Sequence, residues 1–295
     1  MNKVAVTGAN GMTGSHMISL LNKKGISYKA ITRKEWDLTE WKSFDELDDI
    51  FGSVSAVFHF AAELPFTDSI NENWQTQKIF DTNVRSCINI AEWAKLRNIA
   101  IVFLSSSVVY KNPHAIKIKE TDPLVLNGLG GFYGYSKVLA ESVFNHVSEL
   151  GLKCTILRPS SIYGYGLPAN KLVQNYIDIA SSNGLIEITG ARNKINFIHA
   201  YDVASAALQA FTSKAEGIFN ISSRKKNTVL EVAEIAISIS GSGSLVILDD
   251  DKNKTSSFIR FDLESKLAED SFGFEAKVNL EEGMTLMKNK MKIPC

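Results

Sequence analysis

The alternation of short apolar segments with longer segments of helical periodicity is the feature that most constrains the fold of this chain. The apolar segments lie at residues 4–7, 28–32, 54–60, 101–104 and 154–157, and helical patterns separate them. Strands that are apolar on both faces are typical of a parallel sheet covered by helices on both sides. The sequence therefore predicts an α/β fold with a doubly wound parallel sheet.

The regular alternation weakens in the second half of the chain, where short strand patterns mix with helical ones. We expect residues 1–165 to form a Rossmann-like dinucleotide-binding domain. Residues 166–295 are expected to form mainly a smaller substrate-binding lobe. Segments within about 186–221 are expected to return to the first domain.

The composition narrows the class of partner and the compartment. Lys plus Arg and Asp plus Glu both number 32, so the net charge is zero and gives no indication of nucleic acid or an anionic membrane surface. No apolar run is long enough to cross a bilayer. Cys87, Cys154 and Cys295 are far apart and lack metal-ligand spacing, which fits a reducing compartment. We therefore expect a cytoplasmic protein with no metal, nucleic-acid or membrane partner.

A glycine-rich turn joins the first apolar segment to the first helical pattern. Glycine allows the backbone N–H groups of such a turn to approach a pyrophosphate closely, and the following helix N-terminus supplies further donors. A plain tight turn is the alternative interpretation. The position of the motif directly after the first strand favours a bound dinucleotide, with contacts from Gly8, Asn10, Gly11, Met12 and Gly14.

The end of the second strand bears on the choice of cofactor. Sites that prefer NAD usually carry an acid there, which bonds the ribose 2′-hydroxyl. This chain has Arg33 instead, and a guanidinium group pairs well with a 2′-phosphate. A solvent-facing arginine is the alternative. The sequence favours NADP(H) and leaves NAD(H) possible.

A serine cluster follows the strand at residues 101–104. Ligands of open parallel sheets bind at the carboxyl ends of the strands, so a hydroxyl there can bond the substrate oxygen that gains or loses a proton. Serines at a strand end also form turns, which is the alternative. Ser105, Ser106 and Ser107 are the candidates.

Tyr133 and Lys137 are four residues apart in a helical pattern and therefore share one helix face. A free phenol titrates near pH 10, and a neighbouring cation is expected to lower its pKa. The pair therefore predicts a general acid/base for carbonyl–alcohol chemistry. The spacing is common by chance, and its value comes from its place after the serine cluster.

These motifs resemble those of the extended short-chain dehydrogenase/reductases of the NAD-dependent epimerase/dehydratase family. Known members of that family mostly act on nucleotide sugars. The Gly-x-x-Gly-x-x-Gly turn and the Tyr-x-x-x-Lys pair carry the resemblance. Further matching segments lie at residues 58–62, 83–84, 158–164, 196–204, 219–221 and 272–274.

The resemblance implies a role for each matching residue. Tyr133 is the acid/base, Lys137 holds the ribose and tunes the tyrosine, and Ser106 takes the family's Ser/Thr position with Ser107 as the near alternative. Asp37 and Leu38 contact the adenine. The short spacing from the second strand to this pair is similar to that of sugar-nucleotide ketoreductases. The other cofactor contacts implied are Phe60, Ala61, Ala62, Asn83, Ser105, Pro159, Ser161 and Ile162.

Two departures from the family pattern matter for the reaction. Family dehydratases place Asp-Glu where this chain has Ser107 and Val108, so elimination of water is poorly supported. The family's Arg-Asp before Phe197 is Ile195-Asn196 here, so contact with a substrate diphosphate falls to Arg192 or Arg260. Each of these arginines is read equally well as a surface charge, and Ser107 is a further candidate substrate contact.

The sequence thus favours an NAD(P)-dependent oxidoreductase that reduces a 4-keto nucleotide sugar by hydride transfer. A nucleotide-sugar 4-epimerase with tightly bound NAD is the first alternative, because it uses the same residues. A non-catalytic dinucleotide-binding regulator is the second. The resemblance also implies a homodimer formed through helices expected at about 71–97 and 133–150.

Overall fold

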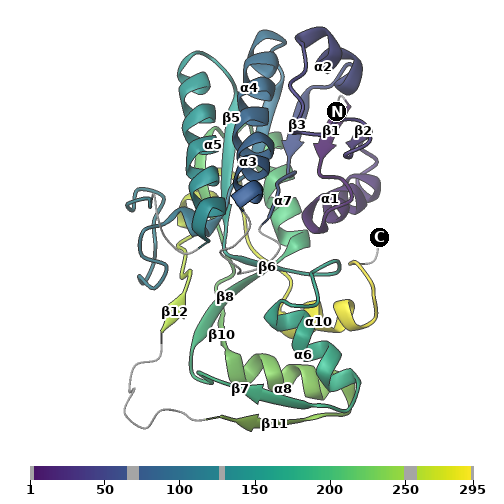
Figure 1. The fold of residues 1–295 in the computed structure, drawn as a ribbon, viewed down its shortest axis with the longest axis vertical. Coiled ribbons are helices and arrows are strands. Elements are labelled where there is room, and N and C mark those ends of the chain that lie inside the picture. The colour runs from purple at the N-terminus through teal and green to yellow at the C-terminus, as the bar shows by residue number, and fades with distance from the viewer. Residues whose placement is uncertain (1–2, 65–72, 126–129, 249–257, 294–295) are drawn as a thin grey trace.

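A computed structural model describes residues 3–64, 73–125, 130–248 and 258–293 (Figure 1). One part of the molecule is a sheet with helices on both faces, and a second part below it in Figure 1 holds smaller sheets and three helices. The α/β fold expected from the alternating pattern is confirmed. Within the described ranges, no helix has the length and apolar character needed to cross a bilayer.

In the described part of the chain the central sheet has six strands, and every neighbouring pair is parallel. The chain runs from β1 to its neighbour on one side and then crosses β1 to continue on the other, so the carboxyl ends of β1 and β3 flank a crevice suited to a ligand. In spatial order the strands are β2 (Tyr28–Ile31), β1 (Val4–Thr7), β3 (Ala56–His59), β4 (Ala100–Leu104), β5 (Cys154–Pro159) and β9 (Gly217–Ile221).

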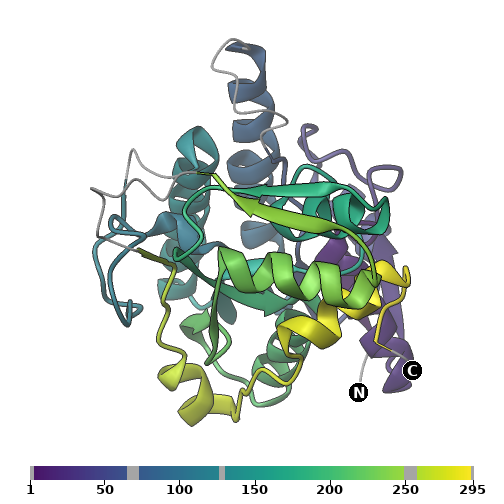
Figure 2. The same cartoon turned by 90° about the horizontal axis from the view of Figure 1, so that it is seen from below.

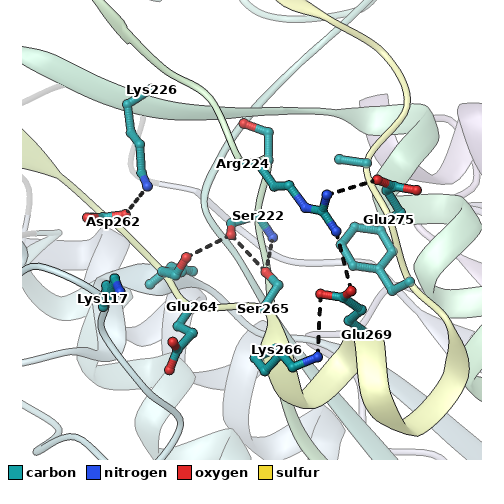
Figure 3. A pocket seen from close by; sticks show the side chains of 14 residues that line it. Lys117, Ser222, Arg224, Lys226, Asp262, Glu264, Ser265, Lys266, Glu269 and Glu275 are labelled. Carbon is teal, nitrogen blue, oxygen red and sulfur yellow. Dashed lines mark hydrogen bonds and ion pairs between the residues drawn. The ribbon is translucent and has the colours of Figure 1, made fainter.

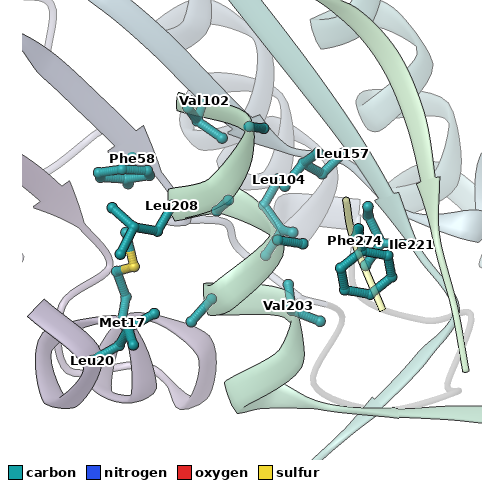
Figure 4. Packing of buried hydrophobic residues seen from close by; sticks show 14 of the residues in the cluster. Met17, Leu20, Phe58, Val102, Leu104, Leu157, Val203, Leu208, Ile221 and Phe274 are labelled. Atoms are coloured by element: carbon teal, nitrogen blue, oxygen red, sulfur yellow. The ribbon is translucent and has the colours of Figure 1, made fainter. Parts of the chain in front are cut away.

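Side chains of these strands alternate between two apolar layers. Val4, Phe58 and Val102 face the layer shown in Figure 4, whereas Ala5 and Phe103 face the opposite one. Both sets are buried, which explains why the strands are apolar throughout. The first layer is covered by α1 (Met12–Lys23), α7 (Ala200–Thr212) and α9 (Lys266–Phe272), and the second by α2 (Phe44–Phe51), α4 (Ser86–Leu96) and α5 (Gly131–Glu149).

The long helix expected at 71–97 is interrupted. It consists of α3 (Asn73–Phe80), a π-helical segment at Asp81–Arg85 and α4, while residues 71 and 72 lie outside the described part. Single π-helical turns are often found at functional sites. Here the segment carries Asn83, one of the expected cofactor contacts.

The smaller lobe has its own core between strands and helices. Figure 2 shows α8 and the C-terminal helix α10 lying across it. Of the segments within 186–221, α7 and β9 lie with the central sheet, whereas β7 and β8 belong to the lobe, and the chain returns once more through α9. The lobe elements are β6 (Ser161–Tyr163), α6 (Leu172–Ser181), β7 (Leu185–Ile188), β8 (Lys194–His199), β10 (Lys226–Thr228), α8 (Val229–Ser240), β11 (Ser244–Ile247), β12 (Ile259–Arg260) and α10 (Leu280–Lys288).

Candidate active site

The glycine turn after β1 leaves no room for side chains. A Cβ on Gly8 would lie 2.8 Å from the Ala61 Cα, and one on Gly14 would overlap the Gly8 carbonyl oxygen. Gly8 also has a φ of +65°, which favours glycine. Gly11 precedes α1 and provides no side-chain cap, so the first N–H groups of the helix remain available to an anion. The turn therefore fits the pyrophosphate of a dinucleotide.

The segment after β3 is hydrogen bonded to the end of β1, beside this turn. Thr7 Oγ1 lies 2.9 Å from His59 Nδ1 and accepts a hydrogen bond from the Ala61 N–H at 3.3 Å. Burial lowers the pKa of His59 to about 3, so the ring is neutral. His59, which lies in one of the segments that match the family, thus supports the packing of β1 against β3. Phe60, Ala61 and Ala62 are half-buried at the edge where the cofactor is expected.

Asn83 joins the β3 segment to α5, the helix that carries Tyr133 and Lys137. Its Oδ1 accepts from the Glu63 N–H at 2.8 Å, and its Nδ2 donates to the Glu63 carbonyl and to Ser136 Oγ at 3.0 and 3.1 Å. The amide is therefore used within the protein. Its role in this structure is to hold Glu63 close to α5.

The residues expected at the adenosine end lie beyond the carboxyl end of β2. The Arg33 side chain is 70% exposed, and its Nη2 lies 3.3 Å from Glu63 Oε2. Asp37 accepts from the N–H and hydroxyl of Thr39, and these hydrogen bonds hold the pKa of Asp37 below its usual range. Leu38 is buried.

The structure brings Ser106, Tyr133 and Lys137 together at the carboxyl end of β4. Ser106 is partly exposed and interacts with the Tyr133 hydroxyl, whereas Ser107 is buried. Lys137 is also buried, and its Nζ donates to the Leu104 carbonyl at 2.9 Å. Of the two candidate serines, Ser106 is therefore the more accessible to a ligand.

Electrostatics at Tyr133 differ from the sequence-based expectation. Burial raises the pKa of Tyr133 to about 12, and the hydrogen bond with Ser106 opposes this only in part. Lys137 does not supply the expected lowering, because its ammonium group faces the Leu104 carbonyl and lies over the Phe103 ring at 4.8 Å. Burial lowers the pKa of Lys137 itself to about 8. Tyr133 is therefore a protonated donor at neutral pH.

A buried ion pair behind the site was not anticipated from the sequence. Arg158 Nη2 lies 2.6 Å from Glu141 Oε2, and both side chains are only 2% exposed. Arg158 also donates to the Tyr110 hydroxyl at 3.0 Å, and Ser105 donates its hydroxyl to Glu141. The Ser105 hydroxyl is thus hydrogen bonded within the protein. The spacing of Glu141 four residues after Lys137, on the same helix face, is the signal that could have found it.

The other residues expected near the substrate lie in or beside the smaller lobe. Asn196, at the family's acid position, accepts from Ser160 Oγ at 3.0 Å and donates to the Ser223 carbonyl at 2.9 Å. Arg260 pairs in register with Ile195, so it lies beside the position of the missing family arginine, and its buried Nε has no hydrogen-bond partner among the described residues. Arg192 is exposed in the turn before β8. Pro159, Ser161 and Ile162 lie where β5 leads into β6.

A cavity of about 230 Å³ lies between the segment after β9 and α9, and none of the expected site residues lines it (Figure 3). Two of its cations are paired with its acids: Arg224 contacts Glu269 and Glu275, and Lys226 contacts Asp262. The cavity is thus separate from the candidate active site. In the described ranges, no three His, Cys, Asp or Glu side chains form a group that could hold a metal ion.

Comparisons with known proteins show the family of the chain and the extent of its shared fold. Residues 4–222 match the model of the NAD dependent epimerase/dehydratase family. The chain is 27% identical over 201 residues to the uncharacterized protein y4nG of Sinorhizobium fredii; the match covers 65% of this chain and 47% of y4nG. This chain thus spans about half the length of that curated relative.

Two solved structures show how far the fold is shared. RMD from Pseudomonas aeruginosa, complexed with NADPH, has a TM-score of 0.82 at 20% identity, with 98% of each chain covered. UDP-glucose 4-epimerase from Thermus thermophilus, complexed with NAD, has a TM-score of 0.79 at 20% identity and the same coverage. Both chains share the fold of the present one over nearly its whole length.

Proposed function

The chain belongs to the NAD-dependent epimerase/dehydratase family, and from that premise we propose that it is an NAD(P)-dependent oxidoreductase acting on a nucleotide sugar. The proposed reaction is reduction of a 4-keto group. The observation that carries the proposal is the contact of the Tyr133 hydroxyl with Ser106, one helical turn from Lys137. A general acid in contact with a second hydroxyl is what reduction of a carbonyl requires.

Each side chain has a defined part in this reaction. Tyr133 donates its proton to the carbonyl oxygen, and Ser106 hydrogen bonds to the same oxygen as negative charge develops on it. Lys137, fixed on the Leu104 carbonyl, positions the ribose and the tyrosine. A bound nicotinamide supplies the hydride.

The state of Tyr133 supports the proposed direction of the reaction. A phenol whose pKa is about 12 is a ready donor and a poor base at neutral pH. A reductase needs the donor first, whereas an epimerase must begin by removing a proton from the sugar hydroxyl. A 4-epimerase remains the second candidate, supported by the shared fold of the UDP-glucose 4-epimerase. Dehydration is disfavoured, because Ser107 is buried and Val108 carries no acid.

The proposed binding mode uses both parts of the fold. We place the pyrophosphate of the cofactor on the glycine turn and its adenosine end near Arg33 and Asp37. The Arg33 guanidinium group favours NADP(H), and NAD(H) is the alternative, since Glu63 is paired with that guanidinium group. Arg260 is the proposed contact for the substrate diphosphate, since it stands beside Ile195. A cytoplasmic homodimer is the proposed state, from the sparse cysteines and the family resemblance.

The test uses the protein with NADPH or NADH and a panel of nucleotide-linked 4-keto sugars, with absorbance of the reduced cofactor as readout. Stoichiometric loss of reduced cofactor with formation of the 4-hydroxy sugar supports the reductase. Interconversion of 4-hydroxy isomers without net cofactor loss supports the epimerase instead. Cofactor binding without either conversion leaves the third alternative, a dinucleotide-binding regulator.

A further inference from the structure

Two cations beyond the central sheet share one carboxylate. Glu63 Oε1 lies 2.7 Å from Lys78 Nζ, and Glu63 Oε2 lies 3.3 Å from Arg33 Nη2. The Glu63 side chain is 13% exposed, whereas those of Lys78 and Arg33 are 35% and 70% exposed. A half-buried acid thus holds two more exposed cations, and a Coulombic interaction is stronger at such a site than in open water.

The position of Glu63 is fixed by its backbone. Asn83 accepts from the Glu63 N–H and donates to the Glu63 carbonyl. Two residues earlier, Ala61 packs against the glycine turn so closely that a Cβ on Gly8 would collide with it. The carboxylate is therefore held on the same edge of the sheet as the pyrophosphate-binding turn.

Arg33 follows the end of β2, which is where dinucleotide sites of this fold distinguish a 2′-hydroxyl from a 2′-phosphate. A phosphate monoester carries roughly two negative charges near neutral pH. The charges already present are balanced, because Glu63 and Asp37 face Arg33 and Lys78. Hydrogen bonds from Thr39 are the main cause of the lowered pKa of Asp37, and these two cations lower it further.

We propose that Glu63 is a cofactor-specificity residue, which holds Arg33 and Lys78 in ion pairs and thereby weakens binding of a 2′-phosphate relative to a 2′-hydroxyl. A 2′-phosphate must break these ion pairs or share the cations with the carboxylate. A 2′-hydroxyl is uncharged and binds without breaking these ion pairs. Arg33 alone is thus an incomplete guide to the preferred dinucleotide, because the charge that opposes it comes from a different strand. The inference rests on the proposed function only in requiring that a nicotinamide dinucleotide binds.

The test compares dissociation constants of NADPH and NADH, from the fluorescence of the reduced nicotinamide, for the wild type and Glu63→Gln. Adenosine 2′,5′-bisphosphate and AMP serve as probes of the adenosine end alone. The matched control is Glu40→Gln, which removes an exposed acid paired with Lys42. Glu63→Gln is expected to tighten NADPH and the bisphosphate about tenfold, the effect of one unit charge a few ångströms away at a partly exposed site. NADH and AMP should change less than about threefold, and the gain should shrink at high salt.

A second variant separates this effect from a general change of the site. Arg33→Met should abolish most of the gain when it is combined with Glu63→Gln, because the released cation is then missing. Unchanged NADPH binding by Glu63→Gln would overturn the proposal. Weaker NADPH binding would also overturn it, and would indicate that Glu63 preorganises the cations for the phosphate. If the selectivity shifts as expected but no sugar is converted, the specificity role stands and the proposed reaction fails. If no dinucleotide or adenosine probe binds the wild type, both are wrong.

Discussion

The ammonium nitrogen of Lys137 lies 5.8 Å from the centre of the Tyr133 ring and donates to the backbone carbonyl of Leu104, the last residue of β4. The hydrogen bond ties the helix of the catalytic pair to the strand that leads into the serine cluster. Ser106, Tyr133 and Lys137 are therefore held by one helix–strand contact. Their relative position does not depend on a direct bond between the lysine and the phenol oxygen.

Removal of the Tyr133 hydroxyl tests its role as the proton donor. Tyr133→Phe is expected to lower kcat by about 10²–10⁴-fold, because the reaction loses its general acid. The dissociation constant of the reduced cofactor should change little, since the ring and the anchoring of Lys137 remain. Steady-state kinetics and fluorescence titration measure the two effects. An unchanged kcat would contradict the assignment.

The pH dependence should report Lys137. Burial lowers its pKa from 10.5 to about 8, so the ammonium group loses its proton as the pH rises through 8. If the charged form holds the ribose and the tyrosine, kcat/KM falls on the alkaline side with an apparent pKa near 8. Lys137→Arg keeps a positive charge at all these pH values, so its residual activity should lack that decline.

The same shift of the Lys137 pKa has a consequence for stability. Between pH 8 and 10.5 the unfolded chain binds a proton at Lys137 that the folded chain has released. The contribution of this residue to the free energy of unfolding therefore rises with pH across that window. Thermal unfolding of wild type and Lys137→Met at several pH values isolates the effect as a difference. A difference that is constant with pH would show that folding does not shift the pKa of Lys137.

The loss of the ion pair between Glu141 and Arg158 should reduce the free energy of unfolding far more than the loss of an ion pair at the surface. Glu141→Gln is expected to reduce the free energy of unfolding by about 3–5 kcal/mol, because Arg158 is left buried and unpaired. Asp270→Asn is the control, since it breaks an exposed pair with Lys266 and should cost less than about 1 kcal/mol. Urea unfolding measures both. Equal losses would mean that Arg158 finds another counter-charge.

The glycine turn should tolerate no side chain at its last position. A Cβ on Gly14 overlaps the Gly8 carbonyl, so Gly14→Ala must displace the backbone that faces the pyrophosphate. The cofactor dissociation constant should rise at least about tenfold. Gly25→Ala is the matched control, because Gly25 also lies near the start of the chain but, among the described residues other than its own chain neighbours, no atom lies within 4 Å of its Cβ position. It should cost about 1–2 kcal/mol of stability from its left-handed backbone and leave cofactor binding intact.

Local spacing accounts for what could be predicted from the sequence. Strand residues such as Val4, Ala5 and Val6 are all apolar because the sheet is covered on both faces, and that pattern is visible without a structure. The approach of Tyr133 and Lys137 follows from the period of one helix. The open helix start after Gly11 follows from a strand, a glycine turn and a helix in immediate succession. Each of these features depends on residues that are neighbours in the chain.

The charges of the site were decided by contacts between distant segments. Arg33 alone favoured a 2′-phosphate, but the fold brings Glu63, 30 residues away, onto its guanidinium group. The sequence predicts a lowered pKa for Tyr133, whereas in the structure the pKa rises to about 12, because burial raises it and the Lys137 ammonium group is turned toward β4. The sequence by itself determined the sheet, the glycine turn and the pairing of Tyr133 with Lys137 on one helix face, since these depend on local period and spacing. Only the tertiary structure decided the ionisation of the pair and the charge around Arg33, since desolvation and Coulombic interactions depend on distances that the chain order does not contain.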